Sequence, residues 1–187
     1  MNQAPRSAVF LDRDGTLIRA LLVGGVSVPP RTLAEVEVLP GVAHALEELK
    51  HAGFLLIVVT NQPDVARGTQ RRHTVDAIHA FLARSLPIDD IACCYHDDAD
   101  RCQCRKPLPG MLVDAATRHH LDLASSFMVG DRWRDIEAGR RAGCTTVKVG
   151  QPPSSDDRVI RANYEVQDLR EAAQVILRSQ VSGRSGA

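Results

Sequence analysis

The stretch Ala8-Val9-Phe10-Leu11-Asp12-Arg13-Asp14-Gly15-Thr16-Leu17 decides the fold. Its first four residues are apolar, which is typical of a strand buried on both faces. Two carboxylates follow at the end of this strand, where they are costly to leave unpaired. An Asx-type turn at Asp14-Gly15 would account for them without any further function. The other interpretation is a Mg²⁺ site in which one carboxylate is free to attack phosphorus.

Short apolar runs alternate with segments of helical period along the rest of the chain. Strands are expected at residues 8–11, 54–59, 91–94, 127–129 and 145–149. Helices are expected near residues 42–49, 75–82, 109–120, 133–142 and 169–177. This alternation predicts an α/β fold with a doubly wound parallel sheet, whose ligands bind at the carboxyl ends of the strands. Residues 150–157 are expected to form a polar loop.

Length and composition limit the class of protein. The 187 residues suit a single domain, with a core at about 8–178 and a flexible tail at about 180–187. Lys and Arg number 23, as do Asp and Glu, so the chain lacks the basic footprint of a nucleic-acid binder. The longest apolar run, residues 54–59, is too short to span a membrane, and the first seven residues lack a signal-peptide core. We expect a cytoplasmic, monomeric enzyme or binding domain without nucleic-acid or membrane partners.

Further polar residues follow two of the other predicted strands. Asp131 and Asp135 lie four apart after residues 127–129, where helix capping would also explain them. Thr60 and Asn61 end the run at 54–59, where a hydroxyl and amides can donate to a phosphate. Arg105-Lys106-Pro107 supplies two adjacent cations, although a solvated surface pair is the simpler explanation for that motif alone.

Taken in order, Asp12-x-Asp14-Gly15-Thr16, Thr60-Asn61-Gln62, Arg105-Lys106-Pro107 and Gly130-Asp131-x-x-x-Asp135 resemble the four motifs of the haloacid dehalogenase superfamily. The resemblance covers roughly residues 8–150. It implies that Asp12 is a nucleophile that becomes phosphorylated, and that Asp14 is the acid and base. It also implies that Thr60 holds the phosphoryl oxygens and that Lys106 neutralises their charge and that of the nucleophile. Mg²⁺ would be held by Asp12, the Asp14 main-chain carbonyl and Asp131, with Asp135 in support.

Four of the five cysteines cluster at residues 93–104, which favours a metal over disulfides in a chain without an export signal. Cys94, His96, Cys102 and Cys104 make a Cys₃His set suited to structural Zn²⁺, with Cys93 as an alternative to Cys94. This loop precedes Arg105-Lys106-Pro107, an arrangement that resembles the heptose bisphosphate phosphatases and the histidinol-phosphate phosphatases. The resemblance implies substrate contacts from four residues: Asn61, Arg67, Arg105 and Arg132.

Spacing leaves no room for a folded cap domain, because only 48 positions separate Asp12 from Thr60 and 46 separate Thr60 from Lys106. We therefore expect an open site roofed by residues 21–31 and the zinc loop. The resemblance implies Mg²⁺-dependent removal of the 7-phosphate of D-glycero-D-manno-heptose 1,7-bisphosphate, in nucleotide-activated heptose biosynthesis. Two alternatives remain: a histidinol-phosphate phosphatase, with Asp97, Asp98 and Asp100 facing the amine, or a non-enzymatic, zinc-stabilised binding module.

Overall fold

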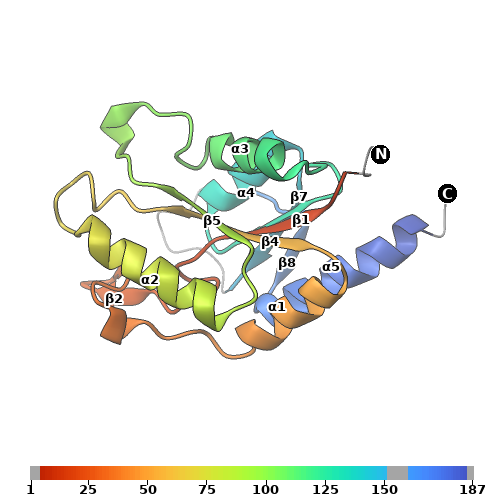
Figure 1. Cartoon of the computed structure of the whole chain (residues 1–187), viewed down its shortest axis with the longest axis horizontal. Coiled ribbons are helices and arrows are strands. Elements are labelled where there is room, and N and C mark those ends of the chain that lie inside the picture. Colours follow the sequence, from red (N-terminus) through yellow and green to blue (C-terminus); the bar gives the residue numbers. More distant parts are fainter. Residues whose placement is uncertain (1–4, 151–159, 185–187) are drawn as a thin grey trace.

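The computed structural model of the chain describes residues 5–150 and 160–184, and Figure 1 shows helices on both faces of a central sheet. The strands of this sheet are β1 (Ala8–Leu11), β4 (Leu55–Asn61), β5 (Asp90–Cys94), β6 (Phe127–Gly130), β7 (Thr145–Val149) and β8 (Tyr164–Val166). The helices are α1 (Val42–His51), α2 (Arg72–Ser85), α3 (Gly110–His119), α4 (Trp133–Ala142) and α5 (Leu169–Arg184). Strands β2 (Leu21–Val23) and β3 (Val26–Val28) form a hairpin, which the short 3₁₀ helix η1 (Leu33–Glu35) follows in the chain. A second 3₁₀ helix, η2 (Asp98–Asp100), lies between β5 and α3.

The strand order is β5-β4-β1-β6-β7-β8, and every neighbouring pair is parallel. From β1 the chain first adds strands on one side and then crosses to add the others on the opposite side. The order therefore reverses at β1, and a crevice for ligands is expected beyond its carboxyl end. In register, Leu11 lies beside both Val58 and Val129, so the segments after β1, β4 and β6 leave the sheet together.

Side chains along β1 alternate between two apolar cores, as strand geometry requires. Val9 and Leu11 join the core formed with α1, α2 and α5, whereas Ala8 and Phe10 join the core formed with α3 and α4. All four side chains are fully buried, which explains why the strand reads as an unbroken apolar run. The same alternation sends the side chain of Asp12 toward α4 and that of Arg13 toward α2.

The structure differs from the sequence prediction at three places. The expected loop at residues 21–31 contains the β2–β3 hairpin, which turns at Gly24 and Gly25, both at positive φ. Strand β8 was not predicted, and α5 continues to Arg184, seven residues past the expected end. Residues 151–159, which include most of the loop predicted at 150–157, lie outside the described residues. No helix in the described part is long and apolar enough to cross a membrane.

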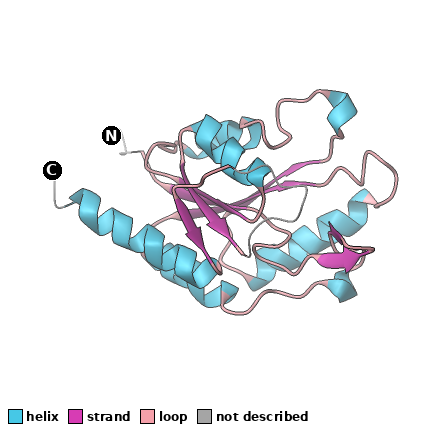
Figure 2. Cartoon of the chain, turned by 180° about the vertical axis from the view of Figure 1, so that it is seen from behind, coloured by secondary structure: helices cyan, strands magenta, loops and turns pink. Residues whose placement is uncertain are grey.

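Figure 2 shows the β2–β3 hairpin standing apart from the main sheet. In Figure 1 this hairpin, the loop after β4 and the loop between β5 and α3 all lie at the end of the sheet opposite the two termini. The carboxyl ends of β1, β4 and β6 lie at that end of the sheet. The fold therefore surrounds one rim of the sheet with three loops.

Candidate active site

Carboxylates from two strand ends meet at this rim. Asp12 follows β1, Asp131 follows β6, and Asp135 lies in the first turn of α4; one oxygen of each lies within 4.8 Å of the others. Glycines allow this approach. A Cβ on Gly15, whose φ is +92°, would lie 2.3 Å from Asp131 Oδ2, and one on Gly130 would lie 2.4 Å from the Asp135 Cβ. The acids predicted to converge do lie together.

Lys106 lies between two of these carboxylates. Its Nζ is 2.6 Å from Asp12 Oδ1, 2.6 Å from Asp135 Oδ1 and 2.7 Å from the Val59 carbonyl oxygen. The side chain is only 2% exposed. Burial disfavours the ammonium, but the two carboxylates outweigh burial and raise the pKa of Lys106 above its ordinary value. The lysine is therefore a charged part of the site at any physiological pH.

Asp131 is the carboxylate that most lacks a partner. Its Oδ1 is buried and accepts no hydrogen bond. Burial, followed by the charges of Asp12 and Asp135, raises its pKa to about 8. Crowded, desolvated carboxylate oxygens are the ligands that a hard divalent cation prefers, and such a cation would remove the repulsion among them. The residues present therefore fit Mg²⁺.

Asp14 faces the same cleft, and two side chains hold it. Arg13 donates from Nε to Oδ2 and from Nη2 to Oδ1, each over 3.1 Å. Gln62 donates to Oδ2 over 2.8 Å and to Thr60 Oγ1 over 2.9 Å. Burial, opposed by Arg13 and reinforced by Asp12, raises the pKa of Asp14. Arg13 and Gln62 were not among the predicted site residues, although both lie within motifs that the sequence singled out.

The four predicted zinc ligands also come together. Cys94 Sγ is 3.0 Å from Cys104 Sγ and 3.7 Å from Cys102 Sγ, and His96 Nδ1 is 3.3 Å from Cys104 Sγ. The four ligand atoms all lie within 4.8 Å of one another, close enough to share one metal ion. Cys93, the alternative ligand, lies outside the cluster. Soft donors in this arrangement fit Zn²⁺.

Two acids of the loop that carries this cluster each bind an arginine. Asp97 accepts two hydrogen bonds from Arg67, of 2.6 and 3.0 Å, and Asp98 accepts one of 2.8 Å from Arg105 Nε. The Arg105 side chain is 11% exposed, and its Nη1 is buried without a hydrogen-bond partner. Both guanidinium groups are thus oriented by acids of the cysteine-bearing loop.

The side chain of Asn61, an expected substrate contact, hydrogen-bonds to the backbone of Lys106. Its side-chain amide donates to the Lys106 carbonyl over 2.9 Å, and its Oδ1 accepts from the Lys106 backbone N–H over 3.0 Å. Both ends of the amide therefore fasten the Arg105–Lys106 segment to β4. Direct contact between Asn61 and a substrate stays a prediction.

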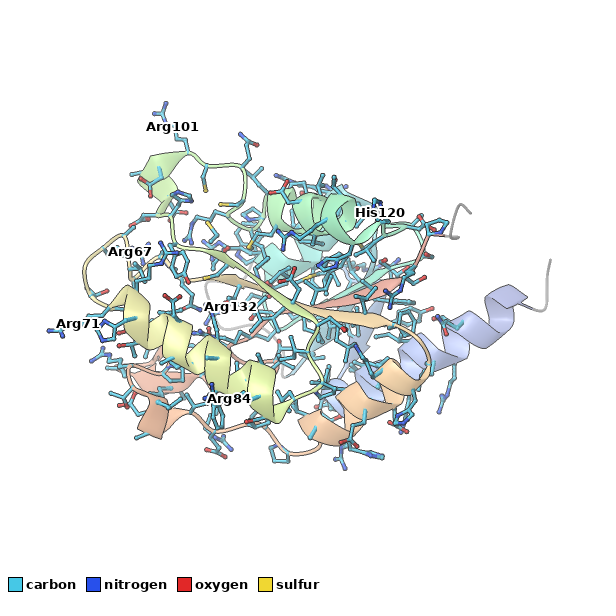
Figure 3. The ribbon with its side chains drawn as sticks, in the orientation of Figure 1. Arg67, Arg71, Arg84, Arg101, His120 and Arg132 are labelled. Carbon is cyan, nitrogen blue, oxygen red and sulfur yellow. The ribbon has the colours of Figure 1, made fainter. Side chains whose placement is uncertain are left out.

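Part of this set lines a cleft of about 330 Å³. At its inner end lie Asp12, Asp14, Thr60, Lys106 and Asp135. Its other lining residues include the arginines Arg67, Arg105, Arg132 and Arg134 and the hairpin segment 26–29. Figure 3 shows Arg67 and Arg132 at the end of the sheet where β4 and β5 finish, whereas Arg101 projects away from the tip of the zinc loop. Arg134 was not predicted, because its position inside α4 gives no sequence signal for a site.

Known proteins resemble this chain over most of its length. A family model described as HAD-hydrolase-like matches residues 103–172. The D-glycero-β-D-manno-heptose-1,7-bisphosphate 7-phosphatase of Escherichia coli K12 is 33% identical over 193 residues, covering 92% of this chain and 95% of that protein. The chain belongs to the haloacid dehalogenase (HAD) superfamily of phosphatases. The family model, this relative and the fold agree with the expectation from the four motifs.

Other relatives of this HAD phosphatase support the same conclusion. The corresponding phosphatase of Bordetella bronchiseptica is 39% identical over 141 residues, covering 73% of this chain and 76% of that protein. The crystal structure of D,D-heptose 1,7-bisphosphate phosphatase from B. bronchiseptica, complexed with magnesium and phosphate, superposes with a TM-score of 0.77 at 32% identity, covering 92% of this chain and 99% of that one. The predicted fold class and phosphoric monoester hydrolase activity are confirmed. A non-enzymatic zinc-stabilised module is excluded.

Proposed function

We propose that this HAD phosphatase removes the 7-phosphate of D-glycero-D-manno-heptose 1,7-bisphosphate, as a step toward nucleotide-activated heptose. The observation that supports this substrate is the charge pattern of the cleft. A reacting phosphate fits beside Asp12 and Lys106, and arginines further along the cleft suit a second phosphate on the same sugar. The substrate named for the relatives in E. coli and B. bronchiseptica carries two such groups. A cytoplasmic location and a monomeric state stay predictions from the sequence.

The reaction proceeds in two steps at Asp12. A carboxylate oxygen of Asp12 bonds to phosphorus as the bond from phosphorus to the sugar oxygen breaks, and Asp14 gives its proton to that oxygen. The enzyme then carries an aspartyl phosphate. Asp14 next takes a proton from water, the water oxygen bonds to phosphorus as the bond from phosphorus to the Asp12 oxygen breaks, and inorganic phosphate leaves with the Asp12 carboxylate restored.

Charge neutralisation contributes most to a phosphoryl transfer of this kind. Thr60 Oγ1 and the Lys106 ammonium hold the phosphoryl oxygens at the inner end of the cleft. Asp12, Asp131 and the Asp14 main-chain carbonyl would hold Mg²⁺, with Asp135 in support, and the cation would supply further positive charge at the transferred group. The Cys₃His cluster would hold Zn²⁺, which would keep the adjoining loop folded, and with it the acids that orient Arg67 and Arg105.

The rival substrate, histidinol phosphate, carries a protonated amine that requires free carboxylates near the cleft. The three candidates in the zinc loop are engaged elsewhere. Asp97 binds Arg67, Asp98 binds Arg105, and Asp100 accepts from the Asp97 backbone N–H over 2.7 Å. The cleft is therefore better suited to a second anion than to a cation.

The decisive test ranks catalytic efficiency on heptose 1,7-bisphosphate (β-anomer first), heptose 7-phosphate and histidinol phosphate in the presence of Mg²⁺. We expect the bisphosphate to be hydrolysed best, EDTA to stop turnover, and added Mg²⁺ to restore it. Asp12→Asn should abolish turnover and phosphoenzyme formation while the fold is retained. Robust hydrolysis of histidinol phosphate with none of the bisphosphate would reject the proposed substrate.

A further inference from the structure

A partly buried chain of polar side chains runs from the active site to helix α2. Arg13, which is fully buried, holds Asp14 through two hydrogen bonds of 3.1 Å. Its remaining nitrogen, Nη1, is 3.0 Å from Nε2 of His79 on α2. A guanidinium group donates and cannot accept, so His79 Nε2 must be the acceptor. The imidazole is therefore the tautomer with its proton on Nδ1.

The surroundings keep His79 in this neutral form. Burial, followed by the charge of Arg13, lowers its pKa to about 4, against an opposing contribution from Asp76 one turn earlier on α2. At neutral pH the imidazole thus continues to accept from Arg13. Without this acceptor one N–H of a fully buried guanidinium would lose its partner, and the side chain would reorient to recover one.

The hydrogen bonds around Asp14 are unequal at its two oxygens. Oδ2 accepts from both Arg13 Nε and Gln62 Nε2, whereas Oδ1 accepts only from Arg13 Nη2. Oδ1 therefore keeps the more open lone pair. Within the described residues between β1 and β4 there is a hairpin, η1 and α1, but no folded cap to press Asp14 into place. The orientation of this carboxylate is therefore set by its hydrogen bonds to Arg13 and Gln62.

We propose that His79 is a positioning residue for phosphoryl transfer, because it fixes the guanidinium of Arg13 and thereby directs Asp14 Oδ1 toward the leaving oxygen. The inference rests on the proposed function, in which Asp14 is the acid and base. It adds a residue from α2 that lies outside the superfamily motifs. This residue should affect kcat/KM only for substrates whose leaving group must be protonated.

The test compares two leaving groups. A sugar alkoxide must be protonated as it departs, whereas the p-nitrophenolate of p-nitrophenyl phosphate departs without a proton. Because kcat/KM reports the steps up to formation of the phosphoenzyme, it isolates the acid role of Asp14. We expect His79→Leu to lower kcat/KM on heptose bisphosphate by about 10- to 100-fold, a part of the ~10²–10⁴ that a general acid contributes. On p-nitrophenyl phosphate the kcat/KM of the same variant should stay within about threefold of the wild-type value.

Two further variants on α2 serve as controls. His79→Gln places an amide oxygen near Arg13 Nη1 and should restore most of the lost activity. His73→Leu, an exposed histidine on the same helix, should leave both substrates unaffected. Equal losses on both substrates in His79→Leu, no loss at all, or no rescue by His79→Gln would overturn the proposal.

Asp14→Asn separates this proposal from the one on which it rests. Its loss of kcat/KM should depend on the leaving group in the same way, and to a greater degree. If kcat/KM falls equally on both substrates, the acid role of Asp14 is refuted, and the inference about His79 is refuted with it. If Asp14→Asn is selective and His79→Leu is not, only the role of His79 is refuted.

Should His79→Leu fail to fold, Arg13→Lys must show the selective loss, because lysine keeps the charge but cannot hold both oxygens. Equal losses there would also overturn the proposal.

Discussion

Replacing Lys106 with Met tests whether the active site is an electrostatic cluster that needs its internal cation. Methionine has a similar length and removes only the charge and its hydrogen bonds. In the folded protein this leaves Asp12 and Asp135, each 2.6 Å from the lost ammonium, without a counter-charge. We therefore expect Lys106→Met to lose stability most when no divalent cation is present.

The magnitude follows from burial. The side chains of Lys106, Asp12 and Asp135 are 2%, 11% and 3% exposed, so solvent screens the interactions poorly. Removing one partner from a buried ion pair costs about 3–5 kcal/mol. For a chain of this length each kcal/mol lowers Tm by about 2–4 °C, so the expected fall is about 6–20 °C.

The effect should depend on pH. The raised pKa of Lys106 lies, like its unfolded value of about 10.4, well above the physiological range, so the titration of Lys106 itself adds no change in stability between pH 5 and 8. Burial already raises the pKa of Asp135 to about 6, against the effect of Lys106, and losing the lysine raises it further. A carboxyl whose folded pKa exceeds its unfolded value destabilises the protein increasingly as pH rises. The variant should therefore be closer to wild type at pH 5 than at pH 8.

The assay is urea or thermal unfolding at pH 5 and pH 8, in EDTA and in saturating Mg²⁺. Mg²⁺ should stabilise Lys106→Met more than it stabilises wild type. Lys50→Met removes a partly exposed lysine from its pair with Asp89 and should cost no more than about 1 kcal/mol at either pH. A Lys106→Met protein as stable as wild type in EDTA at pH 8, or a loss that does not change with pH, would refute the reasoning.

Two other predictions concern the metals. Cys102→Ser should lower bound zinc, Tm and activity together, because metal binding is coupled to folding of the loop, while Cys93→Ser should keep full zinc by elemental analysis; the reverse result would mean that the wrong ligands were chosen. Gly15→Ala should weaken Mg²⁺ activation by at least about tenfold, because its methyl group would collide with Asp131 at a strained positive φ. Gly24→Ala, also at positive φ but in open space, should leave the Mg²⁺ titration unchanged, and equal titrations in both variants would contradict this explanation.

The sequence predicted best those features that depend on local pattern. The apolar run of β1, the helix from Trp133 to Ala142 and the strand from Thr145 to Val149 have the expected bounds. The site residues could be grouped because parallel strands end at one edge of the sheet, so Asp12 and Asp131 had to share a rim. Topology thus turned separate motifs into one site.

The sequence could not reveal contacts that depend on how segments pack. Arg13 lies in the first motif, but its partner His79 is 66 positions away, and nothing in the helical pattern distinguishes that histidine from its exposed neighbour His73. The amide of Asn61 suggests a phosphate donor, yet it binds the Lys106 backbone 45 positions away. Strand β8 has only three residues, too few to show an alternating pattern.

Formal charges at the rim explain why these acids and bases occur together. Asp12, Asp131 and Asp135 carry −3 when ionised and Lys106 carries +1, which leaves −2 around the proposed nucleophile. Asp14 and Arg13 form a separate pair and cancel. A phosphate dianion entering this rim would be repelled, whereas one divalent cation would make the rim neutral. The four arginines of the cleft lining then outnumber its two further acids, Asp64 and Asp98, and leave a net attraction for substrate. The same arithmetic gives Mg²⁺ two functions in the proposed mechanism: it relieves the crowding of buried carboxylates, and it allows the substrate to approach Asp12.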